Sequence, residues 1–195
     1  MEQIIDKIIE AMKNSDSLTD DEEIVRRGLE VIAIKIFFAV IIVIAGLLLG
    51  CFLESILFTI AFTALRQYSG GYHADSQKKC FALSTLMLMI SLGIIKSIKI
   101  FPMLILPLII LTLISIIYVL IAAPIDTPNK RLDKDEIRVY GKRARIFAVL
   151  LTIAAVVLSV LDLSVFACAV MTGIIMSAYL MLKGQISNYI NREEV

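Results

Sequence analysis

The sequence of 195 residues contains no tryptophan, one histidine, three cysteines and four prolines. Three cysteines are an odd number, and they form no CxxC pair, which excludes a disulfide framework and a zinc ribbon. The HExxH, GxSxG and P-loop patterns are also missing, so no metalloprotease, serine-hydrolase or nucleotide-binding motif is present. Because tryptophan is absent, anchoring at a membrane interface has to come from Tyr, Lys and Arg.

Charge is scarce and nearly balanced. Nineteen Lys and Arg face 18 Asp and Glu, for a net charge of +1, whereas 59% of the residues are hydrophobic and the mean hydropathy is +0.89. Soluble domains are about 45–50% apolar, and a water-soluble protein of this size cannot bury so much apolar surface. Composition therefore excludes a soluble enzyme, a disordered chain and a basic nucleic-acid binder, and it predicts an all-α integral membrane protein.

Apolar runs predict about six transmembrane helices within a single membrane domain, residues 1–195. A span needs about 20 apolar residues, and five runs approach or reach that length: 31–50, 80–95, 100–122, 146–161 and 163–182. The last two meet at Asp162, which predicts a tight helical hairpin. The segment 51–65 is shorter and contains Glu54. It forms either a sixth span or a re-entrant segment, and we favour the span.

The distribution of Lys and Arg predicts the orientation of the chain. With the N-terminus inside, 16 of the 19 basic residues fall in segments on the cytoplasmic side, whereas Lys96 and Lys99 lie outside and Lys35 lies in the first span. Cytoplasmic segments of membrane proteins are enriched in Lys and Arg. We therefore expect both termini, the loop 66–80 and the basic loop 123–145 to be cytoplasmic in a bacterial cell membrane.

The N-terminal segment 1–28 does not have the profile of a cleaved signal peptide, because it is too long and too acidic. Apolar residues recur there at helical spacing, from Ile4 and Ile5 to Ile8, Ile9 and Met12. This pattern predicts an amphipathic helix that lies on the membrane or against the helical bundle.

The polar loop 66–80, RQYSGGYHADSQKKC, stands apart from the apolar chain around it. It contains the single histidine, His73, and also Cys80. Gly70 and Gly71 break any helix and allow a close approach of the backbone. A histidine with an ordinary pKa of about 6.5 can accept a thiol proton and later donate it to a leaving amine.

Cys80 is expected in the first turn of the helix that follows the loop, with Asp75 or Ser76 as its N-cap. A helix N-terminus and nearby cations such as Lys78 and Lys79 lower the pKa of a cysteine from about 8.5. In one continuous helix, His73 and Cys80 would lie about 10.5 Å apart along the axis, so the chain between them has to turn for a contact. From spacing alone, a catalytic pair, a metal site and a chance pairing stay open. Metal is the weakest of these, since zinc takes three or four ligands.

The run Arg66–Cys80 resembles the signature of the accessory gene regulator B family, AgrB, which are membrane endopeptidases of Gram-positive quorum sensing. The resemblance extends over most of the chain through its length, its charged N-terminal helix, its multi-span topology and a Pro-Asn-Lys stretch at 128–130. One departure is Arg131, where many relatives carry proline.

By this resemblance, Cys80 is the nucleophile, His73 is the general base and acid, and Arg66 and Gly71 are required neighbours. The family cuts an AgrD-like propeptide on the cytoplasmic side and closes a thiolactone or, occasionally, a lactone ring. Relatives suggest a homodimer among membrane lipids, and no cofactor or metal is implied.

Several residues keep two interpretations. Asp75 either orients His73 or caps a helix, and Arg66 either holds a substrate carboxylate or oxyanion or is an ordinary cation at a helix end. The loop 123–145 attracts an acidic tail or simply follows the positive-inside rule. Cys51 and Cys168 lie in apolar runs, where we expect inert thiols.

Two other functions compete with the peptidase. A small transporter would use Glu54 and Lys35 along a polar path, since ionisable groups at membrane depth are often functional. A membrane scaffold without peptidase activity would need neither His73 nor Cys80.

Overall fold

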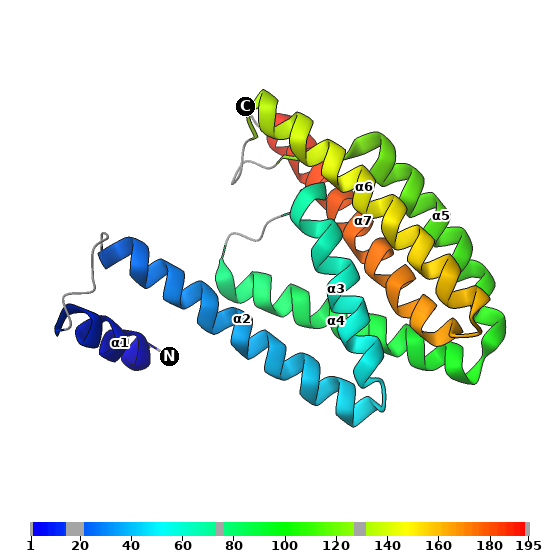
Figure 1. Ribbon diagram of the computed structural model, residues 1–195. Helices are drawn as coiled ribbons and strands as arrows, with labels where there is room; N and C mark the ends of the chain where they lie inside the picture. The colour runs from blue at the N-terminus through cyan, green and yellow to red at the C-terminus, as the bar shows by residue number, and fades with distance from the viewer. Residues whose placement is uncertain (1, 15–21, 73–75, 127–131, 194–195) are drawn as a thin grey trace. The chain divides into compact units, whose positions relative to one another are not determined.

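The computed structural model describes residues 2–14, 22–72, 76–126 and 132–193, which are almost entirely helical (Figure 1). The predicted all-α fold is confirmed. The elements, in chain order, are α1 (Glu2–Asn14), α2 (Glu22–Leu49), α3 (Phe52–Ser69), α4 (Gln77–Ile100), the 3-10 turn η1 (Pro102–Leu104), α5 (Ile105–Ala122), α6 (Lys134–Val160) and α7 (Ser164–Glu193).

The chain divides into two compact units, Met1–Ile41 and Ile42–Val195. The boundary falls inside the continuous helix α2 rather than in a loop. A single membrane domain over residues 1–195 therefore stays a prediction, and the two units are described separately.

In the first unit, α1 carries the amphipathic pattern that the sequence indicates. Ile5 and Ile9 are buried, whereas Lys7 and Glu10 are exposed. An ion pair of 2.7 Å joins Asp6 to Arg26 of α2. Since both partners are substantially exposed, the pair contributes little stability. Burial of Ile5 and Ile9 therefore contributes more to the stability of α1 than this ion pair does.

Five helical segments are long and apolar enough to cross a membrane: Glu22–Leu49, Lys79–Ile100, Pro102–Ala122, Lys134–Val160 and Ser164–Ile190. Helix α3, which contains the expected sixth span 51–65, has 18 residues, with Glu54 in its first turn and Arg66 in its last. It is not among these five. Five spans are thus supported by length and composition, and the sixth stays a proposal.

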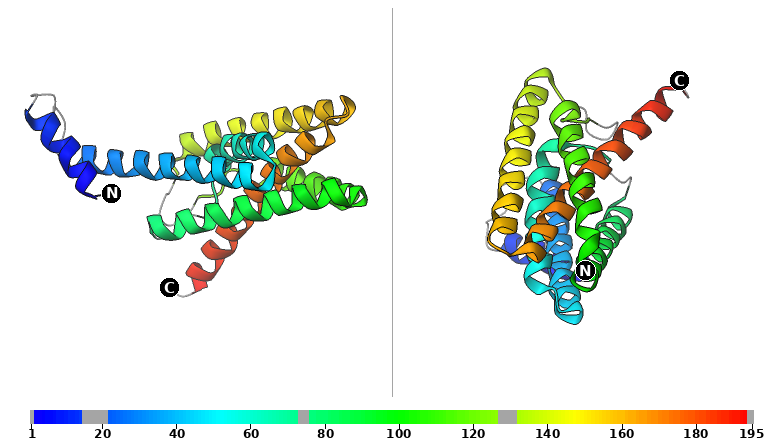
Figure 2. Two further views of the ribbon diagram at one scale, coloured as in Figure 1. Left: turned by 90° about the horizontal axis from the view of Figure 1, so that it is seen from below. Right: turned by 90° about the vertical axis from the view of Figure 1, so that its right-hand side faces the viewer.

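Helix α7 forms the centre of the second unit, where it contacts α3, α4, α5 and α6 (Figure 2). Its buried face is rich in small residues, among them Ala167, Ala169 and Gly173. In a bilayer the hydrophobic effect does not drive helices together, so association depends on close packing, and small residues allow the helix backbones to approach closely. Ser177 adds a hydrogen bond of 3.2 Å from its hydroxyl to the carbonyl of Phe62 in α3.

The end of the second unit that is expected to face outward contains an ion pair between the buried Glu54 and the exposed Lys99. Glu54 lies 2.7 Å from the Nζ of Lys99, which also donates to the carbonyl of Gly50 at 3.4 Å. The pair joins the first turn of α3 to the last turn of α4. Glu54 therefore has a structural partner, which weakens its use as a transport group.

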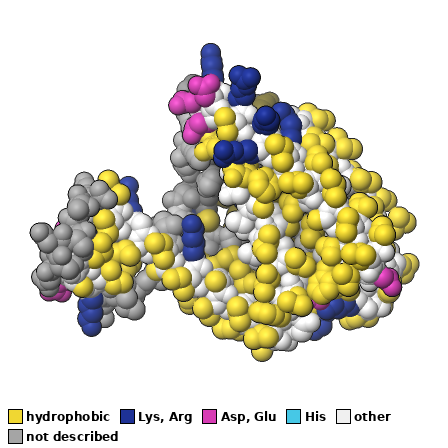
Figure 3. Space-filling view, in the orientation of Figure 1, with side chains coloured by type: hydrophobic (Ala, Val, Ile, Leu, Met, Phe, Trp, Pro, Cys, Tyr) yellow, Lys and Arg dark blue, Asp and Glu magenta, His cyan; other side chains and the backbone are white. Residues whose placement is uncertain are grey.

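The turn between α6 and α7 matches the predicted hairpin. Asp162 stands between the two helices with a φ of 63°, a backbone region that Asp and Asn adopt more readily than most residues. Side chains on this unit are sorted by type: hydrophobic ones cover its flank, while Lys and Arg gather toward its ends (Figure 3). This is the surface that a membrane protein presents to lipid.

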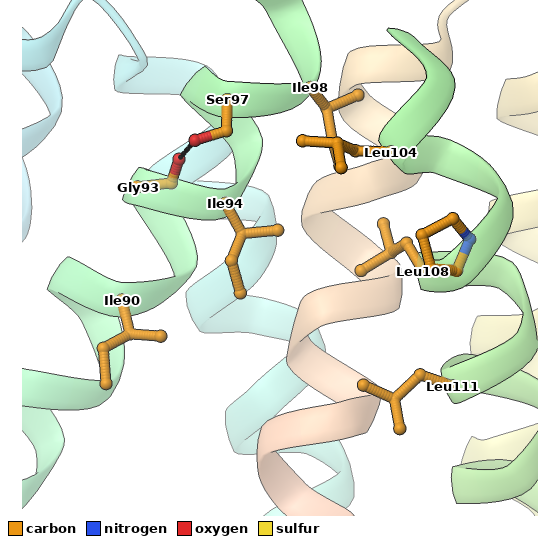
Figure 4. A pocket seen from close by; sticks show the side chains of 9 residues that line it. Ile90, Gly93, Ile94, Ser97, Ile98, Leu104, Leu108 and Leu111 are labelled. Atoms are coloured by element: carbon orange, nitrogen blue, oxygen red, sulfur yellow. Dashed lines mark hydrogen bonds between the residues drawn. The ribbon is translucent and has the colours of Figure 1, made fainter. Parts of the chain in front are cut away.

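An apolar groove of about 480 Å³ lies between α4 and the segment formed by η1 and α5 (Figure 4). Ile90, Ile94, Leu104 and Leu108 line it, and the hydroxyl of Ser97 donates to the carbonyl of Gly93 at 2.8 Å. The groove begins ten residues beyond Cys80, about 15 Å along a helix. It is separate from the polar loop.

The crossing of α3 and α7 yields a test of packing. A Cβ at Gly173 would stand 2.8 Å from the Cβ of Ala61 and 3.0 Å from the backbone nitrogen of Phe62. We expect Gly173→Ala to lower the free energy of unfolding by about 1–3 kcal/mol, because overpacking forces the helices apart. Thermal unfolding in detergent measures this.

Gly93→Ala is the matched control, since a Cβ there meets nothing within 4 Å and Ala favours a helix over Gly. Equal melting temperatures for the two variants would contradict the tight crossing.

Candidate functional site

Cys80 is the fourth residue of α4, at the exposed beginning of that helix. Ser76 is the N-cap: its hydroxyl accepts from the backbone nitrogen of Lys79 at 3.3 Å, and its carbonyl accepts from that of Cys80 at 3.0 Å. The prediction of a first-turn cysteine is confirmed, and Ser76 rather than Asp75 is the cap. His73 and Asp75 lie outside the described residues.

Cys80 lies at the positive end of the α4 helix dipole. No acidic residue occupies the first turn of α4, and the unpaired N–H groups of a helix start carry a partial positive charge. The other two cysteines, Cys51 and Cys168, are buried, as expected of thiols that serve as small hydrophobes. Of the three thiols, that of Cys80 is the accessible one.

Arg66 lies in the last turn of α3 and faces the segment that follows it. Its guanidinium donates to the carbonyls of Gly70 and Tyr72, and to that of Gly71 at 3.4 Å. Burial lowers the pKa of Arg66 to about 10, while attraction to a charged Cys80 acts in the opposite direction. Arg66 is thus protonated at neutral pH, and its donors are engaged by backbone carbonyls.

Gly70 and Gly71 form the turn that leaves α3, with φ values of 69° and 103°. Gly71 donates its N–H to the carbonyl of Ile125 at 2.9 Å, and Ile125 donates to Ser69 at 3.0 Å. A Cβ on Gly70 would overlap the carbonyl of Ile125. Position 70 requires glycine for two reasons: residues with a side chain disfavour this backbone region, and no space exists there for a Cβ.

The predicted basic loop 123–145 is helical from Lys134 onward, since α6 begins there. Asp133 and Glu136 form a capping box, which satisfies N–H groups at the start of the helix. Residues 127–131, with the whole Pro-Asn-Lys stretch and Arg131, lie outside the described residues. Only the first part of this segment is therefore non-helical in the described chain.

Helix α6 brings cations beside the end of α3. The guanidinium carbon of Arg143 lies 5.5 Å from the centre of the Tyr68 ring, and Phe147 stacks on the same ring at 5.2 Å. Arg138, Lys142 and Arg145 are exposed along the same turns. Figure 3 shows Lys and Arg at the end where α6 begins, together with the acidic side chains of its first turn.

Three residues that contact the turn lie in segments for which the sequence pattern predicted no part in the site. They are Ile125, Leu180, whose carbonyl accepts from the N–H of Tyr72 at 2.8 Å, and Lys183, whose Nζ lies 3.9 Å from the centre of the Tyr72 ring. Every residue has a backbone carbonyl, so the residue type does not reveal which carbonyl will accept a hydrogen bond. The single available signal was the continuation of polar and aromatic residues beyond 182, where α7 runs on to Glu193.

In the part of the chain that the structure describes, no group of three or more His, Cys, Asp or Glu residues is arranged to hold a metal ion. The chemistry available here is that of a thiol, a buried guanidinium and a tightly held backbone turn.

The engagement of Arg66 leads to a prediction about exchange. We expect Arg66→Ala to raise the hydrogen-exchange rate of the Gly71 and Tyr72 amides about tenfold, because the turn loses the donors that tie its carbonyls to α3. Exchange measured by mass spectrometry on the protein in detergent tests this. Gln67→Ala is the control, since Gln67 reaches only the carbonyl of Ala64. Unchanged amides in Arg66→Ala would refute the holding role.

Comparison with known proteins identifies the chain. The family model described as accessory gene regulator B matches residues 1–181, while no curated protein and no solved structure matches. A match over nearly the whole chain agrees with the all-helical structure and its apolar candidate spans. The chain therefore belongs to the accessory gene regulator B family, AgrB, and this membership supports a membrane protein with a role in processing an AgrD-like quorum-sensing propeptide.

Proposed function

We propose that this protein is a membrane cysteine endopeptidase that removes the C-terminal tail of an AgrD-like propeptide and promotes closure of a thiolactone or lactone ring. The observation that carries the proposal is the exposed thiol of Cys80 in the first turn of α4, within the electrostatic reach of Arg66. Helix N-termini and neighbouring cations stabilise thiolates. A thiolate is the reactive form of a cysteine nucleophile.

The first step transfers an acyl group. The Cys80 sulfur attacks the scissile carbonyl, the bond to the leaving amine breaks, and the amine departs with the tail after accepting a proton. His73 removes the proton from the Cys80 thiol and delivers it to that amine, which is the ordinary work of a histidine near its pKa. The product is a thioester between Cys80 and the shortened peptide.

The second step closes the ring. A thiol or hydroxyl within the peptide loses its proton to His73 and attacks the thioester carbonyl, and Cys80 is released. Asp75 is proposed to orient His73, in the way that a third group orients the base of other nucleophile pairs.

Water has to be kept from the acyl-enzyme, since hydrolysis would compete with ring closure. A site at a membrane interface helps to exclude water. A thioester lies above an amide in free energy, so the first step, which exchanges an amide for the acyl-enzyme thioester, is uphill. Closure to a thiolactone exchanges one thioester for another and does not recover that free energy. Removal of the tail and export of the product have to draw the reaction forward.

The charge pattern supports an orientation in which Cys80 and both termini face the cytoplasm. Arg138, Lys142 and Arg143 are exposed near the polar loop, whereas Lys99 lies at the opposite end of α4. Cytoplasmic surfaces are enriched in such residues. The same cations are suited to attract an acidic tail, and we propose that the protein works as a homodimer in the lipid bilayer of the cell membrane.

We expect Cys80→Ala and His73→Ala each to abolish cleavage, because one removes the nucleophile and the other the proton carrier. Cys51→Ala and Cys168→Ala are matched controls and should leave cleavage largely intact, since both thiols are buried. Co-expression with the propeptide, followed by mass spectrometry of the peptide, measures the outcome. Full processing by Cys80→Ala would reject the peptidase and return the transporter or scaffold to consideration.

A second prediction concerns the thiol itself. At a fixed pH, iodoacetamide should label Cys80 faster than Cys51 and Cys168, because Cys80 is exposed and the other two thiols are buried. The measurement is the labelling rate of each cysteine, followed by mass spectrometry of the digested protein. Faster labelling of Cys51 or Cys168 would argue against Cys80 as the accessible nucleophile.

A further inference from the structure

The polar loop is held against α7 by a contact between two backbones. Tyr72 donates its N–H to the carbonyl of Leu180 at 2.8 Å. A Cβ on Gly71 would stand 2.6 Å from the oxygen of Leu180 and 2.7 Å from the Cα of Met181. Contacts this short are essentially never made by real side chains, so α7 and the loop lie as close as main chains can.

Gly184 provides the space on the side of α7. A Cβ at this position would stand 2.5 Å from the nitrogen of Tyr72 and 2.7–2.8 Å from the carbonyl carbon and Cα of Gly71. All three atoms belong to the backbone, so no side-chain rotation relieves the overlap. Ala at position 184 would have to displace the turn or bend α7.

Glycine at this place is unfavourable for the helix itself. Within a helix, Gly is less stable than Ala by about 1 kcal/mol, and Gly184 lies well inside α7. Helix stability alone would therefore select Ala. The close approach of Gly71 and Tyr72 is the structural feature that Gly184 serves.

Two further contacts complete the hold on the turn. From the other side, Gly71 donates to the carbonyl of Ile125 at 2.9 Å. Lys183, next to Gly184, lies with its Nζ 3.9 Å from the centre of the Tyr72 ring. The backbone of Tyr72 is therefore held by α7. The backbone of Gly71 is held between α7 on one side and Ile125 on the other.

We propose that Gly184 is a positioning residue for the acyl transfer, acting through Tyr72 on the residue that follows it. Tyr72 directly precedes His73, the proposed base, in the sequence. This inference rests on the proposed function. A shift of about 1 Å in a reacting group lowers a rate about 10²-fold, and the Cβ of Ala at position 184 requires a displacement of that order.

The test uses the full chain in phospholipid vesicles and an AgrD-like propeptide that the unaltered protein is first shown to cleave. In Gly184→Ala, we expect kcat to fall by tenfold or more while KM changes less than threefold, because the substrate still binds but the proton carrier is displaced. The alkylation rate of Cys80 should stay within twofold of the unaltered protein, since α4 is untouched. Gly93→Ala, at a helical glycine with open space around it, should cleave normally.

Where Gly184→Ala lowers the melting temperature by more than a few degrees, Ile125→Pro serves as the second variant. It removes the N–H that Ile125 donates to Ser69, leaves α7 unchanged, and should also lower kcat with little effect on KM.

Failure of this inference is distinguishable from failure of the peptidase. Normal kcat in Gly184→Ala, together with an inactive Cys80→Ala, would overturn the positioning role alone. Equal losses of kcat and of Cys80 alkylation would also overturn it, because they would indicate a general disturbance of the site. Cleavage by Cys80→Ala would overturn the proposed function itself.

Discussion

The turn Ser69–Tyr72 depends on hydrogen bonds between main chains that are distant in sequence. The N–H and C=O groups of residues 70–72 belong to no helix, and at a membrane interface unpaired groups of this kind are costly. Ile125 pairs with Ser69 and Gly71, Leu180 accepts from Tyr72, and Arg66 donates to the carbonyls. The non-helical backbone is thus satisfied by protein, which is the condition for its presence in such a chain.

This arrangement explains why glycine occurs at three points of closest approach. Gly70, Gly71 and Gly184 each lie where a Cβ would meet backbone atoms. The result is a turn fixed by atoms that cannot adjust. Reactive groups gain most from rigid surroundings of this kind, because small displacements cost large factors in rate. Helix α4 is held at both ends by other contacts. The Ser76 cap stabilises its first turn, and the ion pair of Lys99 with Glu54 stabilises its last turn.

Local pattern predicted much of the fold. Apolar length located the five candidate spans, and the Asp162 hairpin and the helix start at Cys80 followed from turn and capping chemistry. Helix ends were less predictable: α6 begins at Lys134, inside the expected basic loop, because a capping box and regular side-chain spacing allow a charged segment to be helical. Helix α3, which contains the expected sixth span 51–65, is not among the five candidates.

The sequence by itself determined the membrane class, the helical architecture and the candidate nucleophile, since each depends on residue type and short spacing. The tertiary structure decided what holds the turn. The sequence left Arg66 as either a ligand for substrate or an ordinary cation at a helix end, and in the structure its guanidinium is engaged by the carbonyls of Gly70 and Tyr72. Ile125 and Gly184 became part of the site only through folding, because a backbone acceptor and a missing Cβ act by position in space, and residue type does not encode which distant segment will lie against them.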